Sequence, residues 1–75
     1  MEQQPHIHIN AVDLRGRLIQ LHAERSETAA TGLAEIPSYM ADLQEEIEAT
    51  RQLYVLTAVT EIAELRAELF GAQHG

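Results

Sequence analysis

Two histidines near the N-terminus come closest to the spacing of a metal site. His6 and His8 alternate with isoleucines. Alternate side chains of an extended segment point to the same side, so both imidazoles could bind one ion. A structural zinc site needs four ligands, so His22, His74, a carboxylate or a second chain would have to complete it. We therefore expect no cofactor and no metal site, and keep a His-dependent metal-responsive protein as an alternative.

Two groups of glutamates could serve as carboxylate sites. The first comprises Glu45, Glu46 and Glu48, and the second comprises Glu61, Glu64 and Glu68. A carboxylate metal site in a helical bundle needs an inward-facing pair or a Glu-x-x-His motif, which neither group supplies. Solvated helix faces are the simpler interpretation. Glu61 is the exception, because it falls close to an apolar stripe and could pair across an interface with an arginine such as Arg15 or Arg17.

Nucleophilic catalysis finds little support in the sequence. The chain has no cysteine, no glycine-rich phosphate loop, and no evident base beside Ser26 or Ser38. Tyr54 lies on an apolar stripe, where an aromatic side chain with a bonded hydroxyl is more typical than a catalytic acid. We predict that the protein is not an enzyme.

The charge balance restricts the possible partners. The sequence contains twelve acidic residues, five arginines and no lysine, and the net charge is −7. This excess argues against direct binding to nucleic acid or to an anionic membrane surface. It leaves open an acidic inhibitor or regulator that occupies the basic surface of a DNA-binding partner. No secretion signal and no apolar run of membrane-spanning length is visible, so we expect a cytoplasmic protein.

A short helix is predicted over residues 10–30. Asn10 is a preferred N-cap, Asp13 suits the positive end of the helix dipole, and Ile9 and Leu14 have the spacing of a hydrophobic staple. The main apolar stripe of this helix comprises Leu14, Leu18 and Leu21, and a second, smaller stripe beside it comprises Val12, Ile19, Ala23 and Ala30. Gly16 either weakens this helix or permits close approach of another helix.

A long helix is predicted over residues 38–70. Gly32 is a plausible helix-ending residue, Pro37 fits the first position of a new helix, and Ser38 is a competing N-cap. One apolar stripe with coiled-coil spacing runs along the whole helix: Met40, Leu43, Ile47, Tyr54, Ala58, Ile62, Leu65 and Leu69. A second stripe occurs only in the later half, where residues 52–60 carry no charge.

These elements predict an all-α fold, an antiparallel two-helix hairpin over residues 10–71, with a flexible or extended segment over 1–9 and a frayed tail over 72–75. The hairpin core is expected to comprise Leu14, Leu18, Leu21, Leu43, Ile47 and Tyr54. The same alignment predicts that Arg25 reaches Asp42 and that His22 reaches Glu46. The shorter helix would cover the longer one only to about residue 57.

The uncovered half of the long helix is the predicted interaction surface. A soluble monomer rarely exposes a large apolar patch, so we expect a homo-oligomer, a dimer in the first place, that completes a four-helix bundle. An unidentified protein partner is the other possibility. The self-association interface is expected to comprise Val55, Leu56, Val59, Ile62, Ala63 and Phe70. The predicted function is a non-enzymatic protein–protein interaction module.

Two stretches carry a resemblance to known sequences. Residues 54–69, followed by Gly71 and Gly75, and the Leu14–Leu18 stretch resemble small uncharacterised helical-hairpin proteins of actinobacteria and their mobile elements. The resemblance implies the hairpin fold and carries over no activity and no catalytic residues. It agrees with the absence of lysine and the abundance of alanine, which are typical of GC-rich coding.

Overall fold

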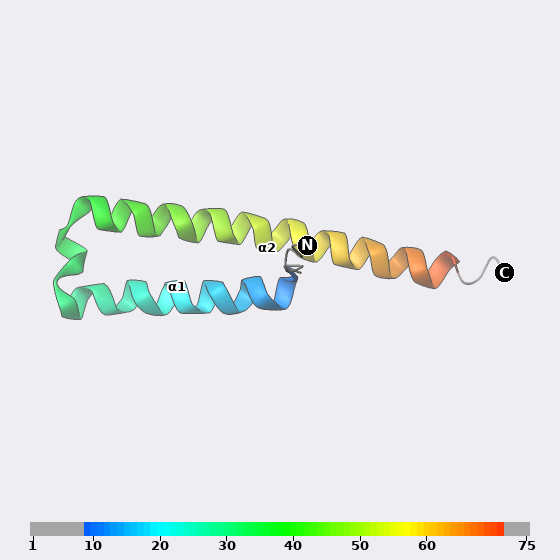
Figure 1. Ribbon diagram of the computed structural model, residues 1–75, viewed down its shortest axis with the longest axis horizontal. Helices are drawn as coiled ribbons and strands as arrows, with labels where there is room; N and C mark the ends of the chain where they lie inside the picture. The colour runs from blue at the N-terminus through cyan, green and yellow to red at the C-terminus, as the bar shows by residue number, and fades with distance from the viewer. Residues whose placement is uncertain (1–8, 72–75) are drawn as a thin grey trace, which may run out of the picture.

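Residues 9–71 are described by a computed structural model, in which two antiparallel helices are joined by a short turn (Figure 1). Helix α1 spans Ala11–Thr31 and helix α2 spans Pro37–Gly71, with a 3₁₀ turn, η1, over Leu33–Glu35. The prediction of an all-α helical hairpin is confirmed. The bounds of both helices lie within one residue of those predicted from capping and turn signals.

The N-terminus of α1 is held by its own cap residue. Asn10 has extended backbone dihedral angles, and its side-chain oxygen accepts a hydrogen bond of 2.8 Å from the Asp13 amide. The Asn10 carbonyl accepts the first helical bond, from Leu14, at 3.1 Å. Both contacts follow from the residue type, because a short amide side chain can satisfy an amide that the helix leaves unpaired.

The turn between the helices combines one glycine and one proline. Gly32 ends α1 with a φ of 83°, a left-handed conformation that other residues rarely adopt. Pro37 is the first residue of α2, where a missing amide proton costs nothing, and the Ile36 carbonyl accepts the first bond of that helix from Met40. Ser38, the competing cap candidate, therefore lies inside the helix.

Replacing either of two glycines by alanine should change the stability of the hairpin, in opposite directions. Gly16 lies inside α1, and Gly32 directly follows it. A Cβ at Gly16 would meet nothing within 4 Å, so Gly16→Ala should stabilise the protein by about 1 kcal/mol through helix propensity. Gly32→Ala also meets open space, but its left-handed φ should cost about 1 kcal/mol. Thermal unfolding followed by circular dichroism would test the pair, and equal shifts of the same sign would contradict this assignment.

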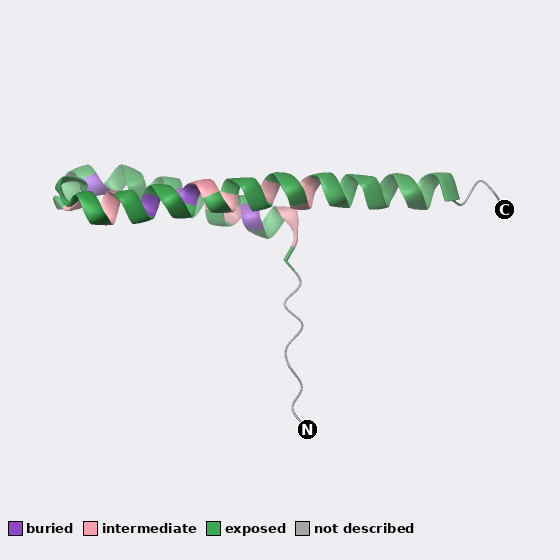
Figure 2. Ribbon diagram, turned by 90° about the horizontal axis from the view of Figure 1, so that it is seen from above, coloured by how far each residue is buried: buried purple, intermediate pink, exposed green. Residues whose placement is uncertain are grey.

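The core of the hairpin is small. The buried apolar side chains are Leu14, Leu21, Leu43 and Ile47, and Leu18 and Tyr39 pack against them, half-buried (Figure 2). Thr28 is buried as well, and its hydroxyl donates to the Arg25 carbonyl at 2.6 Å. Of the six residues predicted for the core, Leu18 and Tyr54 are only half-buried. A core of this size contributes little stability to a chain of 75 residues.

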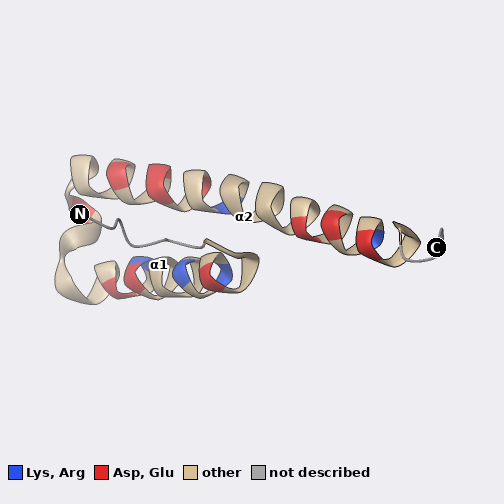
Figure 3. Cartoon of the chain, turned by 45° about the vertical axis from the view of Figure 1, so that its right-hand side comes forward, with Lys and Arg blue, Asp and Glu red and all other residues tan. Residues whose placement is uncertain are grey.

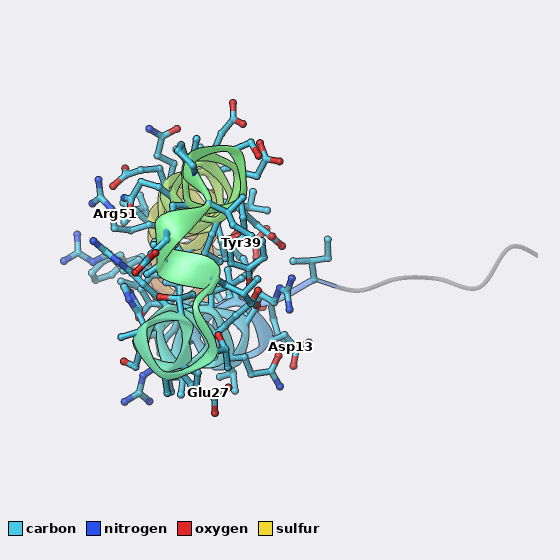
Figure 4. All side chains as sticks on the ribbon, turned by 90° about the vertical axis from the view of Figure 1, so that its left-hand side faces the viewer. Asp13, Glu27, Tyr39 and Arg51 are labelled. Atoms are coloured by element: carbon cyan, nitrogen blue, oxygen red, sulfur yellow. The ribbon has the colours of Figure 1, made fainter. Side chains whose placement is uncertain are left out.

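Polar contacts between the helices lie along one edge of the hairpin, which we call the closed edge. Arg17 forms an ion pair with Glu46. The hydroxyl of Tyr39, which Figure 4 labels, donates a hydrogen bond to Glu24. The predicted contacts of Arg25 with Asp42 and of His22 with Glu46 are wrong, because Arg25 makes no ion pair over residues 9–71 and Glu46 pairs with Arg17. The apolar stripes predict which residues lie between the helices. They do not predict on which edge of the hairpin each charged side chain lies.

The hydrogen bond to Glu24 raises the pKa of the Tyr39 phenol above its ordinary value, together with partial desolvation and the charge of the same carboxylate. The protonated phenol is the form that the fold favours. Its contribution to stability is therefore complete below the ordinary pKa of tyrosine and is lost as the pH rises through the raised pKa. The contact therefore contributes at neutral pH, and its contribution changes with pH only in alkaline solution.

The two helices differ in length, and the difference leaves a projecting segment. Helix α1 has 21 residues and α2 has 35, so at 1.5 Å per residue they span about 32 and about 52 Å. Every residue over 59–71 is exposed, and we call this segment the overhang (Figures 1 and 2). The hairpin thus places a whole helical segment beyond the reach of its own core.

Candidate interaction surface

The row of α2 residues that faces α1 changes character where α1 ends. Residues at alternating spacings of four and three form this row, and those beside α1 are buried or half-buried: Leu43, Ile47, Thr50, Tyr54 and Thr57. The same spacing continues into the overhang as Glu61, Glu64 and Glu68, which we call the acidic row (Figure 3). The hairpin seam therefore does not continue as an apolar surface on this face.

The first member of the acidic row joins the overhang to the hairpin. A Glu61 carboxylate oxygen accepts a hydrogen bond of 3.0 Å from the backbone amide of Ala11, the first residue of α1. A carboxylate is favourable there, because the helix N-terminus carries a partial positive charge and unpaired amides. Glu61 and Asn10 together satisfy two of these amides. The sequence signalled Asn10 as a cap but not Glu61, which lies 50 residues away.

A second face of the overhang is apolar. Its side chains repeat at spacings of three and four, as in a coiled-coil seam, and we call them the apolar row: Val55, Ala58, Ile62, Leu65 and Leu69. Between 48% and 59% of the surface of each is exposed, except for Ala58, which is half-buried. Within residues 9–71, no segment covers this row beyond the end of α1.

A second apolar row lies on another face of the same segment and comprises Leu56, Val59, Ala63 and Phe70. All four are exposed, and Leu56 is exposed by 64%. The residues predicted for self-association, Val55, Leu56, Val59, Ile62, Ala63 and Phe70, divide between the two rows. Leu65 and Leu69 belong to the apolar row as well, although the sequence predicts them only for the main stripe of α2. The two sets overlap because a single apolar stripe drifts around a helix over its length.

An open hollow lies where the overhang leaves the hairpin. It is lined by Leu56, Thr57, Thr60, Glu61 and Glu64 of α2 and by Ile9. The exposed Ile9 side chain approaches the overhang here but leaves most of the apolar surface uncovered. The hollow holds two carboxylates and two threonine hydroxyls beside the apolar side chains of Ile9 and Leu56.

The remaining candidate ligands do not assemble in the described part of the chain. His6, His8 and His74 lie outside residues 9–71, and within that range no three histidine or carboxylate side chains come together as a metal site requires. Neither described helix combines the length and apolar character needed to cross a bilayer.

One edge of the hairpin carries two arginines, of which Arg51 pairs with a glutamate and Arg15 makes no ion pair over residues 9–71. Over residues 9–71 the ion pairs are Arg17–Glu46 and Arg51–Glu48, the latter with 3.0 Å between nitrogen and oxygen. Arg15, Arg25 and Arg66 make no ion pair in this range. Arg15 and Arg51 lie on the edge opposite the closed edge, as helical spacing from Arg17 and Glu46 requires, and we call it the open edge.

Compared with protein-family models, with curated proteins and with solved structures, the chain gives no match. The resemblance to actinobacterial helical-hairpin proteins therefore stays a prediction. The main surface features of the described residues are the apolar row, the second apolar row and the acidic row.

Proposed function

We propose that this chain is a non-enzymatic protein–protein interaction module that self-associates through the later half of α2. The observation that carries the proposal is the imbalance between core and surface. Four large apolar side chains are buried in the hairpin, whereas eight are exposed on α2 from residue 53 onward: Leu53, Val55, Leu56, Val59, Ile62, Leu65, Leu69 and Phe70. Contiguous apolar surface of this kind marks interaction sites in soluble proteins.

The size of this surface suits a protein partner. A fully exposed side chain of this class carries roughly 100 Å² of apolar surface, so eight that are about half exposed carry on the order of 400 Å². A standard interface takes about 800 Å² from each partner, a little over half of it apolar. One such interface would therefore cover most of the exposed apolar area.

The test is the absolute mass in solution, measured by light scattering on a sizing column over a wide concentration range. One chain weighs 8.4 kDa, and we expect a dimer or a multiple of it. Val59→Asp should weaken association by at least about tenfold, because it places a charge in an apolar interface. Unchanged mass with unchanged helicity would place the interface elsewhere, and a monomeric parent protein at all concentrations would contradict self-association.

A second candidate function rests on the acidic row. Glu61, Glu64 and Glu68 are exposed and contribute to the excess of acid, which supports an inhibitor or regulator that occupies the basic surface of a DNA-binding partner. Binding of this kind depends on charge and should weaken steeply between low and high salt. Retrieval of host proteins on the immobilised chain at the two salt concentrations would test it, and salt-independent binding would contradict it.

A further inference from the structure

The open edge of the hairpin and the apolar row of the overhang belong to one continuous face. Arg17, Glu24, Tyr39 and Glu46 occupy the closed edge. Helical spacing then places Arg15 and His22 of α1 on the open edge, and Gln44, Arg51 and Ala58 of α2 beside them. Further along α2, the same spacing reaches Leu65. One side of the molecule is therefore polar and basic over the hairpin and apolar over the overhang.

We infer that a second copy of this chain binds this face in antiparallel orientation, so that each overhang lies along the open edge of the other hairpin. This inference rests on the self-association proposed above and specifies its geometry. A two-fold axis near residue 60 of α2 would set Leu65 opposite the partner's Val55, and Ile62 opposite the partner's Ala58. The same patch then serves both copies, as an isologous interface requires.

Charge complementarity supports this orientation. In an antiparallel pair, the apolar rows of the two copies contact each other. The acidic row of each overhang then lies beside this contact, on the side where the partner's α1 lies. Glu68 then comes level with the open edge, where Arg15 and Arg51 lie exposed. The overhang carries three glutamates and one arginine, whereas the open edge carries Arg15 and His22 on α1 and, on α2, Arg51 paired with Glu48. Opposite charges therefore meet twice in the dimer, once at each end.

The buried area also favours the antiparallel arrangement over a parallel one. In a parallel pair, apolar contact between the two copies of α2 would begin only at Val55. Toward the N-terminus of α2, the same row consists of the polar and charged residues Arg51, Glu48 and Gln44. An antiparallel pair overlaps over residues 49–71 of each α2 and adds contacts to the partner's α1, including the exposed Val12 and Ile19. Only the larger overlap approaches the roughly 800 Å² per partner of a stable dimer.

Single cysteines would test the orientation, because the chain has none of its own. We expect neither Val55→Cys nor Leu65→Cys alone to form a covalent dimer under mild oxidation. In the antiparallel pair the two copies of residue 65 lie about 15 Å apart along the axis, beyond the reach of a disulfide. An equimolar mixture of the two variants, unfolded and refolded together, should give a mixed disulfide between position 55 and the partner's position 65.

The outcomes separate the geometry from self-association itself. A dimeric mass together with self-crosslinking of Leu65→Cys would overturn the antiparallel arrangement while leaving self-association intact. A monomeric mass for the unmodified chain would overturn both. A dimer in which only the mixture crosslinks would support both.

A charge exchange provides an independent measurement. Glu68→Arg should weaken dimerisation about tenfold, because two symmetry-related contacts become repulsive, and adding Arg15→Glu should restore it. Glu45→Arg, an equal charge change on an exposed α2 residue away from the open edge, should leave the dissociation constant within about threefold. Equal effects of Glu68→Arg and Glu45→Arg, with no rescue, would overturn the contact between overhang and open edge.

Discussion

Ile62→Asp should convert the associated protein to monomers, with a dissociation constant raised at least about 100-fold, since each dimer would bury two uncompensated carboxylates. Ile62 is 55% exposed in the hairpin and lies at the middle of the apolar row. The substitution therefore costs little in an isolated chain and much in an interface. Light scattering and sedimentation over a concentration series would measure the change.

A matched control for Ile62→Asp is Ala67→Asp. Ala67 is exposed in the same overhang but lies on the side opposite the apolar row. Ala67→Asp therefore adds the same charge at a similar position along the helix, away from the apolar row. We expect it to leave the dissociation constant within a few-fold. Equal loss of association in the two variants would mean that net charge, and not the apolar row, governs self-association.

Leu21→Ala should unfold the hairpin or leave it barely folded. Leu21 is the most completely buried side chain, with no exposed surface, and it contacts the cluster formed with Leu43 and Ile47. Truncating a fully buried leucine costs about 2–5 kcal/mol, from lost transfer free energy and the cavity left behind. So small a core has little stability to lose. Urea unfolding followed by circular dichroism would measure the effect.

Leu56→Ala makes the same chemical change at a side chain that is 64% exposed. A change in unfolding free energy of about 0.5 kcal/mol or less is expected there. If Leu56→Ala destabilised the protein as much as Leu21→Ala, the second apolar row would be part of the stabilising core of the assembly. Comparing the two variants at several protein concentrations would separate the hairpin core from the interface.

Local signals in the sequence determined most of the hairpin. Asn10 acts through its side-chain oxygen, and Gly32 and Pro37 act through their backbone geometry, so the helix bounds could be predicted within a residue. The core leucines followed from helical spacing. None of this required knowledge of the tertiary contacts, because each signal concerns the residue itself and a few neighbours along the chain.

Contacts between the helices were less accessible to sequence reasoning. Arg17 and His22 lie on opposite edges of α1, and either could meet an acidic residue of α2 at a similar level. The choice depends on a small rotation of one helix about its axis, which large leucine side chains tolerate. The Glu61 contact with Ala11 depends on where α1 ends relative to α2. Thr28 is buried in the last turn of α1, and its residue type gave no sign of this.

The difference in length between the helices has a consequence for hydrogen exchange. Amides near Leu43 and Ile47 are protected by a tertiary core, whereas those of the overhang depend on helical hydrogen bonds alone. An uncovered helical segment of about 13 residues is marginal in water. Protection of the amides over 59–71 therefore measures how much of the time this segment is covered by a partner, and it does so residue by residue.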